Sequence, residues 1–383
     1  MEIIQSKLSN TGTSIFTKMS ALAKEENAIN LSQGFPDFSV SEELIGMIST
    51  SMKHGFNQYA PMPGILELRE NIAEKIALLY GKNYQPETEI TITAGATQAI
   101  FTIISAFIHR NDEVIIFAPA FDCYQPAIQL NGGKTIEIEL AAPDFKVDWN
   151  KVKNAITSKT KMILINTPHN PTGTILRKTD MLTLEEMVRD TNIIVLSDEV
   201  YEHIIFDGEK HQSIACFKSL AERSFLVASF GKTFHATGWK MGYCAAPKEL
   251  MQEFRKVHQF NVFSVNHPMQ KGLSQYIQNA ENYLHLPAFY QAKRDFFLNA
   301  IKSSKFSIKP SKGTYFQLLG YENLSNENEI DFAIRLTKEF KIASIPISVF
   351  YQKKVNQNLL RFCFAKNEKT LLQAATILNQ IGG

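Results

Sequence analysis

The chain has 383 residues, of which 44% are hydrophobic and 20% are charged, a composition typical of a globular protein with a sizeable core. This length predicts a large domain with a second, smaller one. The formal net charge is only +2 and the basic residues are scattered, which argues against a nucleic-acid or acidic-membrane surface. No apolar stretch approaches the roughly 20 residues of a membrane span, and the first residues lack a signal-peptide core, so we expect a cytoplasmic protein.

A helix is predicted at 17–24, followed by an irregular loop around Gly34. The loop at 57–64 precedes a well-patterned helix at 65–80, with Gly81 directly after it. Repeated strand-then-helix units come next. Short β-branched and leucine-rich runs predict strands at 89–93, 113–117, 134–140, 162–166, 193–197, 225–228 and 241–245.

Apolar strands that alternate with helices indicate an α/β fold with a mostly parallel sheet covered on both faces. Long helical patterns at 249–262 and 269–294 follow the sheet, and the second leads into an α+β region. We expect an N-terminal segment at 1–45, a large domain at 46–285 and a small C-terminal domain at 286–383.

The four cysteines are far apart and form no C-x-x-C pair. In a chain of this size their spacing predicts free, mostly buried thiols in a reducing compartment, with no disulfide framework and no metal site. They are Cys123, Cys216, Cys244 and Cys363.

Polar residues follow the carboxyl ends of several predicted strands, where ligands bind in an open α/β sheet. They are Thr97, Asn170, Asp198, Ser229 and Lys232. Desolvation at the end of a buried strand lowers the pKa of a lysine from roughly 10.4, so the Lys232 amine is a candidate nucleophile toward a carbonyl cofactor. A solvated lysine that merely ends a strand is the alternative.

The stretch 95–97 closes a strand and opens a helix, so its backbone N–H groups and the Thr97 hydroxyl suit a phosphate. Ser229, Lys232 and Lys240 are candidates to complete a small site for a single phosphate. An ordinary helix N-cap is the alternative. Neither G-x-G-x-x-G nor G-x-x-x-x-G-K-[ST] occurs, which argues against a dinucleotide or a nucleoside triphosphate.

Other residues have a chemical and a structural interpretation. Asp198 follows a buried run and needs a partner, which a pyridinium nitrogen supplies, with Tyr201 in reach of the same ligand; a helix N-cap is the alternative. The Asn170 amide suits a phenolic oxygen, or belongs to a plain turn. Phe121 suits stacking on a planar ring, or core packing. Arg361, in a strand-like apolar run, suits a carboxylate, or a structural salt bridge.

With these residues the chain resembles the fold-type I, class I pyridoxal-phosphate-dependent aminotransferases over nearly its whole length. The shared motifs lie at 170–173, 197–201, 229–232, 238–242 and Arg361. Segments that are similar to bacterial methionine aminotransferases, of the kynurenine/glutamine transaminase group, lie at 31–38, 57–62, 198–203, 256–260, 313–316 and 345–350. The resemblance implies a large domain with a mostly parallel seven-stranded sheet flanked by helices, plus a smaller α+β domain.

The resemblance also implies a catalytic group of Lys232, Asp198 and Tyr201. In this view Lys232 links to pyridoxal 5′-phosphate and moves the substrate proton, and Asp198 lies on the pyridine nitrogen. Asn170 and Tyr201 lie on the phenolic oxygen, and Phe121 lies over the ring.

Phosphate and substrate contacts follow from the same resemblance. The phosphate site would comprise Gly95, Ala96, Thr97, Ser229 and Lys240, joined by Tyr59 from the partner subunit of a homodimer. The substrate α-carboxylate would be held by Arg361, Asn170 and the Gly34 backbone, and the side-chain pocket would be walled by Phe16, Tyr59 and Phe263.

Two positions depart from many family members. Gly95 lacks the side-chain contact that a serine supplies there, and Lys240 replaces the arginine of aspartate-type enzymes. The segment 260–268 contains no arginine for a second carboxylate, which disfavours aspartate as the donor.

The sequence therefore predicts a ping-pong aminotransferase that moves the amino group of methionine, or of another hydrophobic or aromatic amino acid, to a 2-oxo acid. Two alternatives stay open: a C–S β-lyase with the same lysine and cofactor, and a regulator that binds the cofactor. A NAD-linked oxidoreductase is disfavoured by the missing glycine motif.

Overall fold

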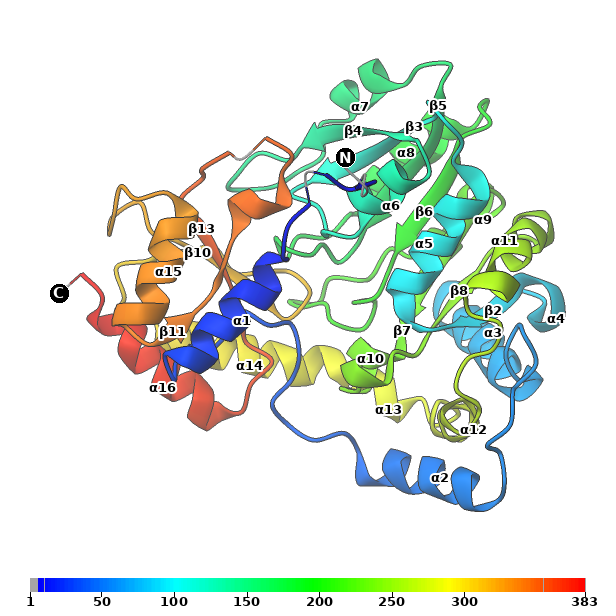
Figure 1. Cartoon of the computed structure of the whole chain (residues 1–383), viewed down its shortest axis with the longest axis horizontal. Coiled ribbons are helices and arrows are strands. Elements are labelled where there is room, and N and C mark those ends of the chain that lie inside the picture. The colour runs from blue at the N-terminus through cyan, green and yellow to red at the C-terminus, as the bar shows by residue number, and fades with distance from the viewer. Residues whose placement is uncertain (1–5, 10, 354, 383) are drawn as a thin grey trace, which may run out of the picture.

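The computed structural model describes residues 6–9, 11–353 and 355–382. A seven-stranded sheet with the strand order β2-β8-β7-β6-β5-β3-β4 forms its centre (Figure 1). The strands are β2 (Ile90–Thr93), β3 (Glu113–Ala118), β4 (Lys134–Glu139), β5 (Thr160–Asn166), β6 (Ile194–Asp198), β7 (Ser224–Ser229) and β8 (Gly242–Ala245). Only β8 runs against its neighbours, β2 and β7, and the other pairs are parallel, so the predicted mostly parallel sheet is confirmed.

Successive residues of the strands enter opposite hydrophobic cores. In β3, Ile115 packs on one side of the sheet, whereas Val114 and Ile116 pack on the other. Helices α5 (Gly95–Phe107), α6 (Tyr124–Leu130) and α11 (Lys248–Asn261) supply the second of these cores, and α3 (Leu66–Tyr80), α8 (Lys178–Val188) and α12 (His267–Tyr276) contribute to the first. Because both faces are covered, the strands carry nearly continuous apolar runs.

The C-terminal part of the chain builds a second sheet with the order β12-β13-β10-β9. Its strands are β9 (Ser307–Ile308), β10 (Phe316–Gly320), β12 (Ile345–Pro346) and β13 (Leu359–Cys363), accompanied by helices α14 (Leu286–Ala300), α15 (Glu329–Glu339) and α16 (Glu368–Gln380). The first helix, α1 (Ile15–Glu25), packs on α15, and β1 (Ile29–Asn30) pairs in parallel with β11 (Ile342–Ala343). Figure 1 shows α1 beside α15, so the segment that follows the N-terminus packs with the C-terminal part of the chain.

The remaining helices are short or peripheral. They are α2 (Glu42–Lys53), α4 (Pro86–Glu89), α7 (Trp149–Ala155), α9 (Lys218–Ala221), α10 (Phe230–Thr233) and α13 (Glu281–Leu284), with 3₁₀ turns η1 (Ile214–Cys216), η2 (Thr237–Trp239) and η3 (Ile347–Phe350).

Two sequence expectations need correction. The helix predicted at 269–294 is three helices, α12, α13 and α14, because Pro287 is tolerated only in the first turn of α14 and Asn279 accepts the Glu281 N–H in the connecting turn at 3.2 Å. The domain boundary at residue 45 falls inside α2. Since a helix forms as one unit, a boundary that keeps it whole lies before residue 42.

The prediction of free, mostly buried cysteines is confirmed in part. All four cysteines are free, but only Cys244 and Cys363 are buried, while Cys123 is half-buried and Cys216 is exposed.

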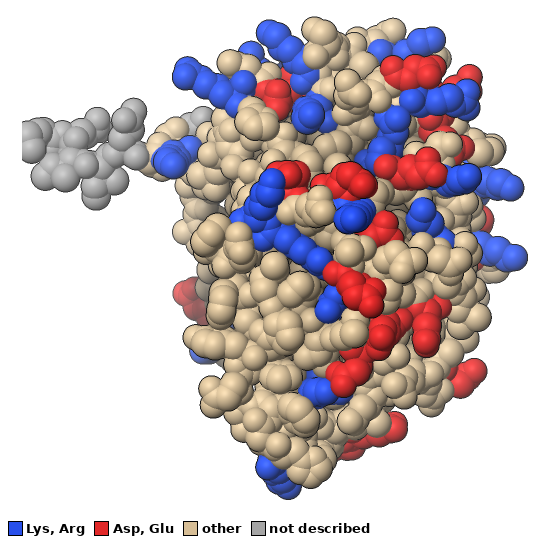
Figure 2. Space-filling model, turned by 90° about the vertical axis from the view of Figure 1, so that its right-hand side faces the viewer, with Lys and Arg blue, Asp and Glu red and all other residues tan. Residues whose placement is uncertain are grey.

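On the face in Figure 2, acidic and basic side chains are intermingled over the upper part and sparse at the lower left. Within the described residues, no helix is long and apolar enough to cross a membrane, and no cluster of three potential metal ligands occurs.

Candidate active site

The sheet register brings the predicted site residues to one edge. Asn166 pairs with Asp198 at the ends of β5 and β6, and Ser229 at the end of β7 pairs with Gly242, the first residue of β8. Gly242 also pairs with Thr93, two residues before α5 begins. Parallel strands end at the same edge, so residues far apart in the sequence meet there.

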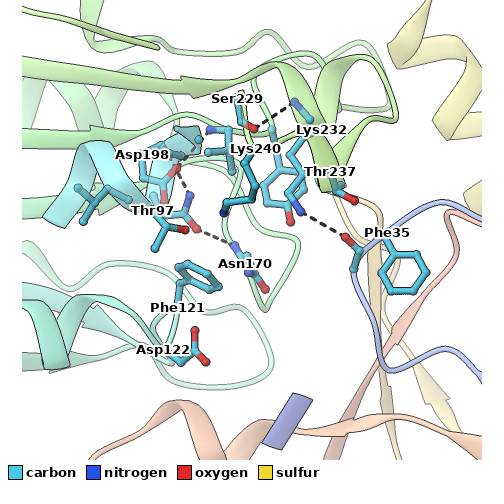
Figure 3. A pocket seen from close by; sticks show the side chains of 18 of the residues that line it. Phe35, Thr97, Phe121, Asp122, Asn170, Asp198, Ser229, Lys232, Thr237 and Lys240 are labelled. Atoms are coloured by element: carbon cyan, nitrogen blue, oxygen red, sulfur yellow. Dashed lines mark hydrogen bonds between the residues drawn. The ribbon is translucent and has the colours of Figure 1, made fainter. Parts of the chain in front are cut away.

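A cavity of about 400 Å³ opens at this edge. Figure 3 shows Thr97, Asn170, Asp198, Ser229, Lys232 and Lys240 gathered around one space, with Phe121 and Asp122 on its lower side. The cavity is also lined by Phe16, Gly34, Gly95, Ala96, Tyr201 and Arg361. The structure therefore brings together every predicted site residue except Tyr59 and Phe263.

Lys232 lies in the short helix α10, directly after β7. Its ammonium donates a hydrogen bond to the Gly34 carbonyl at 3.2 Å. Burial lowers the pKa of Lys232 to about 8, and the nearby cations Arg361 and Lys240 act in the same direction. The amine is therefore more readily deprotonated than an ordinary lysine, as a nucleophile or a base requires.

Asp198 is buried at the end of β6, with only 3% of its surface exposed. No helix begins there: residues 200–203 form turns, so the N-cap interpretation is wrong. Its carboxylate accepts a hydrogen bond from the Tyr124 hydroxyl at 2.6 Å and from the Val200 N–H at 3.3 Å. Burial raises the pKa of Asp198 to about 6, and the Tyr124 bond opposes this rise. A cationic ring nitrogen is the kind of partner that such a carboxylate needs.

Arg361 is the most unusual charged residue of the cavity because it is buried without a carboxylate. Its guanidinium donates to the Asn170 side-chain oxygen at 2.7 Å and to the Ser32 carbonyl at 3.0 Å, and it lies 3.8 Å from the ring centroid of Phe316. In the part of the chain that the structure describes, no acidic side chain forms an ion pair with it, and its Nε atom has no hydrogen-bond partner. The structural salt bridge is thus excluded there, and an external carboxylate fits.

The start of α5, together with Gly242 and Lys240, forms a candidate cradle for a phosphate. Gly95 has a positive φ of 77°, and a Cβ on it would lie 3.4 Å from Lys240 Nζ. A Cβ on Gly242 would come within 3.0 Å of the Gly95 carbonyl carbon. The Ser229 hydroxyl accepts the Gly231 N–H at 3.2 Å. Free helix N–H groups, hydroxyls and one ammonium are the donors that bind phosphate, so these residues fit pyridoxal phosphate.

Tyr59 and Phe263 lie outside the cavity of their own chain. They are 80% and 54% exposed, and their ring centroids are 5.1 Å apart. Their predicted contacts with cofactor and substrate need a second copy of the chain, and these roles stay predictions.

Several site residues escaped the sequence analysis. Tyr124 contacts Asp198, and Asn166 ties two strand ends together by donating to the Asp198 carbonyl at 2.8 Å and accepting the Asn170 N–H at 2.8 Å. Asp122 and Phe316 line the cavity. Asn166 is the last residue of a predicted strand, and this position could have identified it as a site residue. Tyr124 and Phe316 carry no such sequence signal, because only their tertiary contacts place them at the site.

A second cavity, of about 770 Å³, lies between residues 143–147 and 307–312. Its arginine and two of its lysines are already paired: Lys309 with Asp144, Lys312 with Asp207 at 2.8 Å, and Arg177 with Glu209 at 3.1 Å. The first cavity, with its unpaired guanidinium, is therefore the better candidate for an active site.

Comparison with known proteins agrees with this geometry. The family model for aminotransferase class I and II matches residues 26–378. The chain is 46% identical over 380 residues to a methionine aminotransferase of Escherichia coli, covering 99% of this chain and 98% of that protein. It is 32% identical to a kynurenine–oxoglutarate transaminase of Dictyostelium discoideum, covering 96% of this chain and 93% of that one.

Solved structures show the same likeness. The crystal structure of the Escherichia coli methionine aminotransferase superposes with a TM-score of 0.97 at 46% identity, covering 99% of this chain and all of that one. A Thermus thermophilus aspartate aminotransferase double mutant superposes with a TM-score of 0.91 at 27% identity, covering both chains completely. The chain belongs to the class I and II aminotransferases, enzymes that depend on pyridoxal phosphate.

Proposed function

We propose that the protein transfers the amino group of methionine, or of another hydrophobic or aromatic amino acid, to a 2-oxo acid in two half-reactions. One observation carries the proposal: the unpaired guanidinium of Arg361 lines the same cavity as Lys232 and Asp198. A substrate carboxylate on Arg361 is then held in the same cavity as the Lys232 amine. The 46% identity to a methionine aminotransferase supports methionine as a donor.

Pyridoxal phosphate, when bound, supplies an aldehyde that receives the amino group and a ring that accepts the electrons released at the substrate Cα. Lys232 would hold the cofactor through its amine, and the amine, once free, would take up the proton from the substrate Cα and give it back within the same half-reaction. Asp198 would keep the ring nitrogen protonated. Because the Asn170 side-chain oxygen accepts a hydrogen bond from Arg361, the amide nitrogen of Asn170 would be left to donate to the phenolic oxygen of the cofactor, as would the Tyr201 hydroxyl.

The remaining assignments concern binding. Backbone N–H groups at Gly95 and Ala96, the hydroxyls of Thr97 and Ser229, and the Lys240 ammonium would hold the phosphate. Phe121 would pack on the ring. The substrate carboxylate lies between Arg361, Asn170 and the Gly34 backbone, with Phe16 beside the substrate side chain, where aromatic faces favour a thioether.

We further propose a homodimer in which Tyr59 and Phe263 serve the neighbouring active site. Exposed apolar side chains support it: Phe260, three residues before Phe263, is 87% exposed, and Ile45 and Met52 of α2 are 41% and 43% exposed. Sedimentation analysis tests the dimer, and a monomer with full activity at low concentration contradicts it.

A donor panel of methionine, phenylalanine, glutamine and aspartate, each with several 2-oxo acids, tests the function. We expect methionine and phenylalanine to give the highest kcat/KM and the Lys232→Ala variant to lose turnover and covalent cofactor. A clear preference for aspartate contradicts the substrate assignment. Release of ammonia from a thioether donor, together with an oxo acid shortened by loss of the thiol, indicates a C–S lyase instead.

A further inference from the structure

The carbonyl oxygen of Gly34 accepts two hydrogen bonds inside the candidate active site. One comes from Lys232 Nζ at 3.2 Å and the other from the Tyr315 hydroxyl at 2.5 Å. Gly34 lies in the loop after β1, Lys232 follows β7 of the central sheet, and Tyr315 directly precedes β10 of the second sheet. One carbonyl therefore links the central amine to a tyrosine from another part of the fold.

The hydroxyl of Tyr315 is held firmly in place. Its side chain is fully buried, and its ring meets the ring of Tyr201 edge to face at a centroid distance of 5.2 Å. The residue before it, Thr314, has a φ of 63°, a conformation rare for a β-branched residue. Two hydrogen bonds maintain it: the Thr314 N–H donates to Ile204 at 2.9 Å, and its hydroxyl accepts the Phe316 N–H at 3.1 Å.

The loop that carries the carbonyl fits closely against this tyrosine. A Cβ on Gly34 would lie 2.7 Å from Cζ of Phe316 and 3.5 Å from Cε2 of Tyr315. The neighbouring Gln33 fastens the same loop to α1, since its amide donates to the Phe16 carbonyl at 3.0 Å. The position of the Gly34 carbonyl thus depends on glycine at this site and on the Tyr315 hydroxyl.

We propose that Tyr315 is a positioning residue for Lys232. The Tyr315 hydroxyl holds the Gly34 carbonyl in the place where this carbonyl accepts a hydrogen bond from the free lysine amine. The proposal rests on the proposed function, in which this amine moves the Cα proton. A lysine side chain has four rotatable bonds, so its amine can occupy many positions when no hydrogen bond fixes it. A rigid acceptor restricts the side chain to conformations that keep the amine close to the reacting carbon.

Several other groups also influence the pKa of Lys232, and a test must distinguish their effects from that of the Tyr315 hydroxyl. Cys363 and Asp198 act to raise the pKa of Lys232, whereas burial, Arg361 and Lys240 lower it. The rings of Tyr201 and Tyr315 lie 5.7 and 5.6 Å from the ammonium. A change at Tyr315 alone leaves all the formal charges in place, so a change in lysine behaviour is attributable to the lost hydroxyl.

The matched pair of variants is Tyr315→Phe and Tyr290→Phe. Tyr290 is also fully buried and packs against Tyr315 at a centroid distance of 5.8 Å, but within the described residues its hydroxyl has no hydrogen-bond partner. Each variant removes one buried oxygen and keeps the ring. Melting temperatures of the two variants check that they are folded to the same extent.

The first measurement uses the holoenzyme with methionine deuterated at Cα. For Tyr315→Phe we expect the rate of the first half-reaction to fall about tenfold, the effect of one hydrogen bond on a barrier. The Cα isotope effect should rise and the KM for methionine should stay within about twofold of the wild-type value. Tyr290→Phe should resemble the wild type in all three.

The second measurement does not depend on turnover. Acetic anhydride labels Lys232 in the protein freed of cofactor, and the pH dependence of labelling is followed by peptide mass spectrometry. Displacement of the Gly34 carbonyl from the ammonium moves the labelling midpoint to lower pH, by roughly half a pH unit, in Tyr315→Phe but not in Tyr290→Phe. Identical labelling profiles and isotope effects in the two variants overturn the proposal. If methionine is no substrate of the wild type, the proposed function fails, and the labelling result still decides the role of Tyr315.

Discussion

The Tyr124 hydroxyl donates a 2.6 Å hydrogen bond to Asp198 Oδ2, and both side chains are almost completely buried. The two residues lie 74 positions apart, one in α6 and the other at the end of β6. Burial raises the pKa of Asp198 to about 6, and this hydrogen bond stabilises the ionised form against that rise. Tyr124 thereby helps to keep the carboxylate charged at neutral pH.

Replacing Tyr124 by phenylalanine should raise the pKa of Asp198 further, because the carboxylate loses a donor. A smaller fraction of Asp198 is then ionised at any pH below neutrality, so the acidic limb of the kcat/KM profile should move up by about one pH unit. Rates between pH 5 and 8 measure this shift. Tyr290→Phe is the control, and an acidic limb equal to that of the control contradicts the prediction.

The Arg361→Lys variant should lose substrate binding. Lysine keeps the charge, but its ammonium is unable to bond Asn170 and Ser32 while also offering two parallel donors to a carboxylate. We expect kcat/KM for methionine to fall about 100-fold, mainly through KM. The amine that corresponds to methionine without its carboxylate serves as the control substrate. An equal loss with that amine argues against carboxylate binding by Arg361.

Asp122 places a carboxylate at the exposed rim of the substrate cavity, where it should repel acidic side chains. The Asp122→Asn variant is expected to increase the kcat/KM for glutamate about fivefold relative to that for methionine, a size set by partial screening in water. Asp144→Asn, outside this cavity, is the charge-matched control. An unchanged glutamate-to-methionine ratio rules out a role of Asp122 in selectivity.

A buried ion pair supports the segment that carries Asp198 and Tyr201. Lys75 Nζ lies 2.5 Å from Glu202, which also accepts the Tyr80 hydroxyl at 2.5 Å. The Lys75→Met variant leaves this carboxylate without a cation and should lower the free energy of unfolding by about 3 kcal/mol, measured in urea. The double variant with Glu202→Gln should lose less, and an equal or larger loss contradicts an uncompensated charge as the cause.

The same pair predicts a pH dependence. Burial acts to raise the pKa of Glu202, but Lys75 and His203 outweigh it and hold the value at about 2. Because this is below the unfolded value of roughly 4.3, the stabilisation is present above that pH and is lost as the pH falls toward 2. The advantage of the wild type over Glu202→Gln should therefore shrink over that interval.

Local pattern determined much of this protein. Apolar runs of five or six residues specify the strands, since a parallel sheet covered on both faces has no polar side to alternate with. The residues that end these runs, such as Asp198 and Lys232, are recognisable because polar groups at such places need a ligand or water. Pro287 is a sequence signal for the start of a new helix, but the helical periodicity on both sides of it led to the prediction of one continuous helix.

Only the tertiary structure decided which of these residues meet and in what electrostatic state. Sheet order placed Asn166 beside Asp198, and packing of the second sheet brought Arg361 to Asn170 and Tyr315 to Gly34. Such pairings join residues up to 281 positions apart and leave no periodic trace in the sequence. The physical reason is that burial and partners, rather than residue type alone, set the pKa and the free hydrogen-bonding capacity of each group.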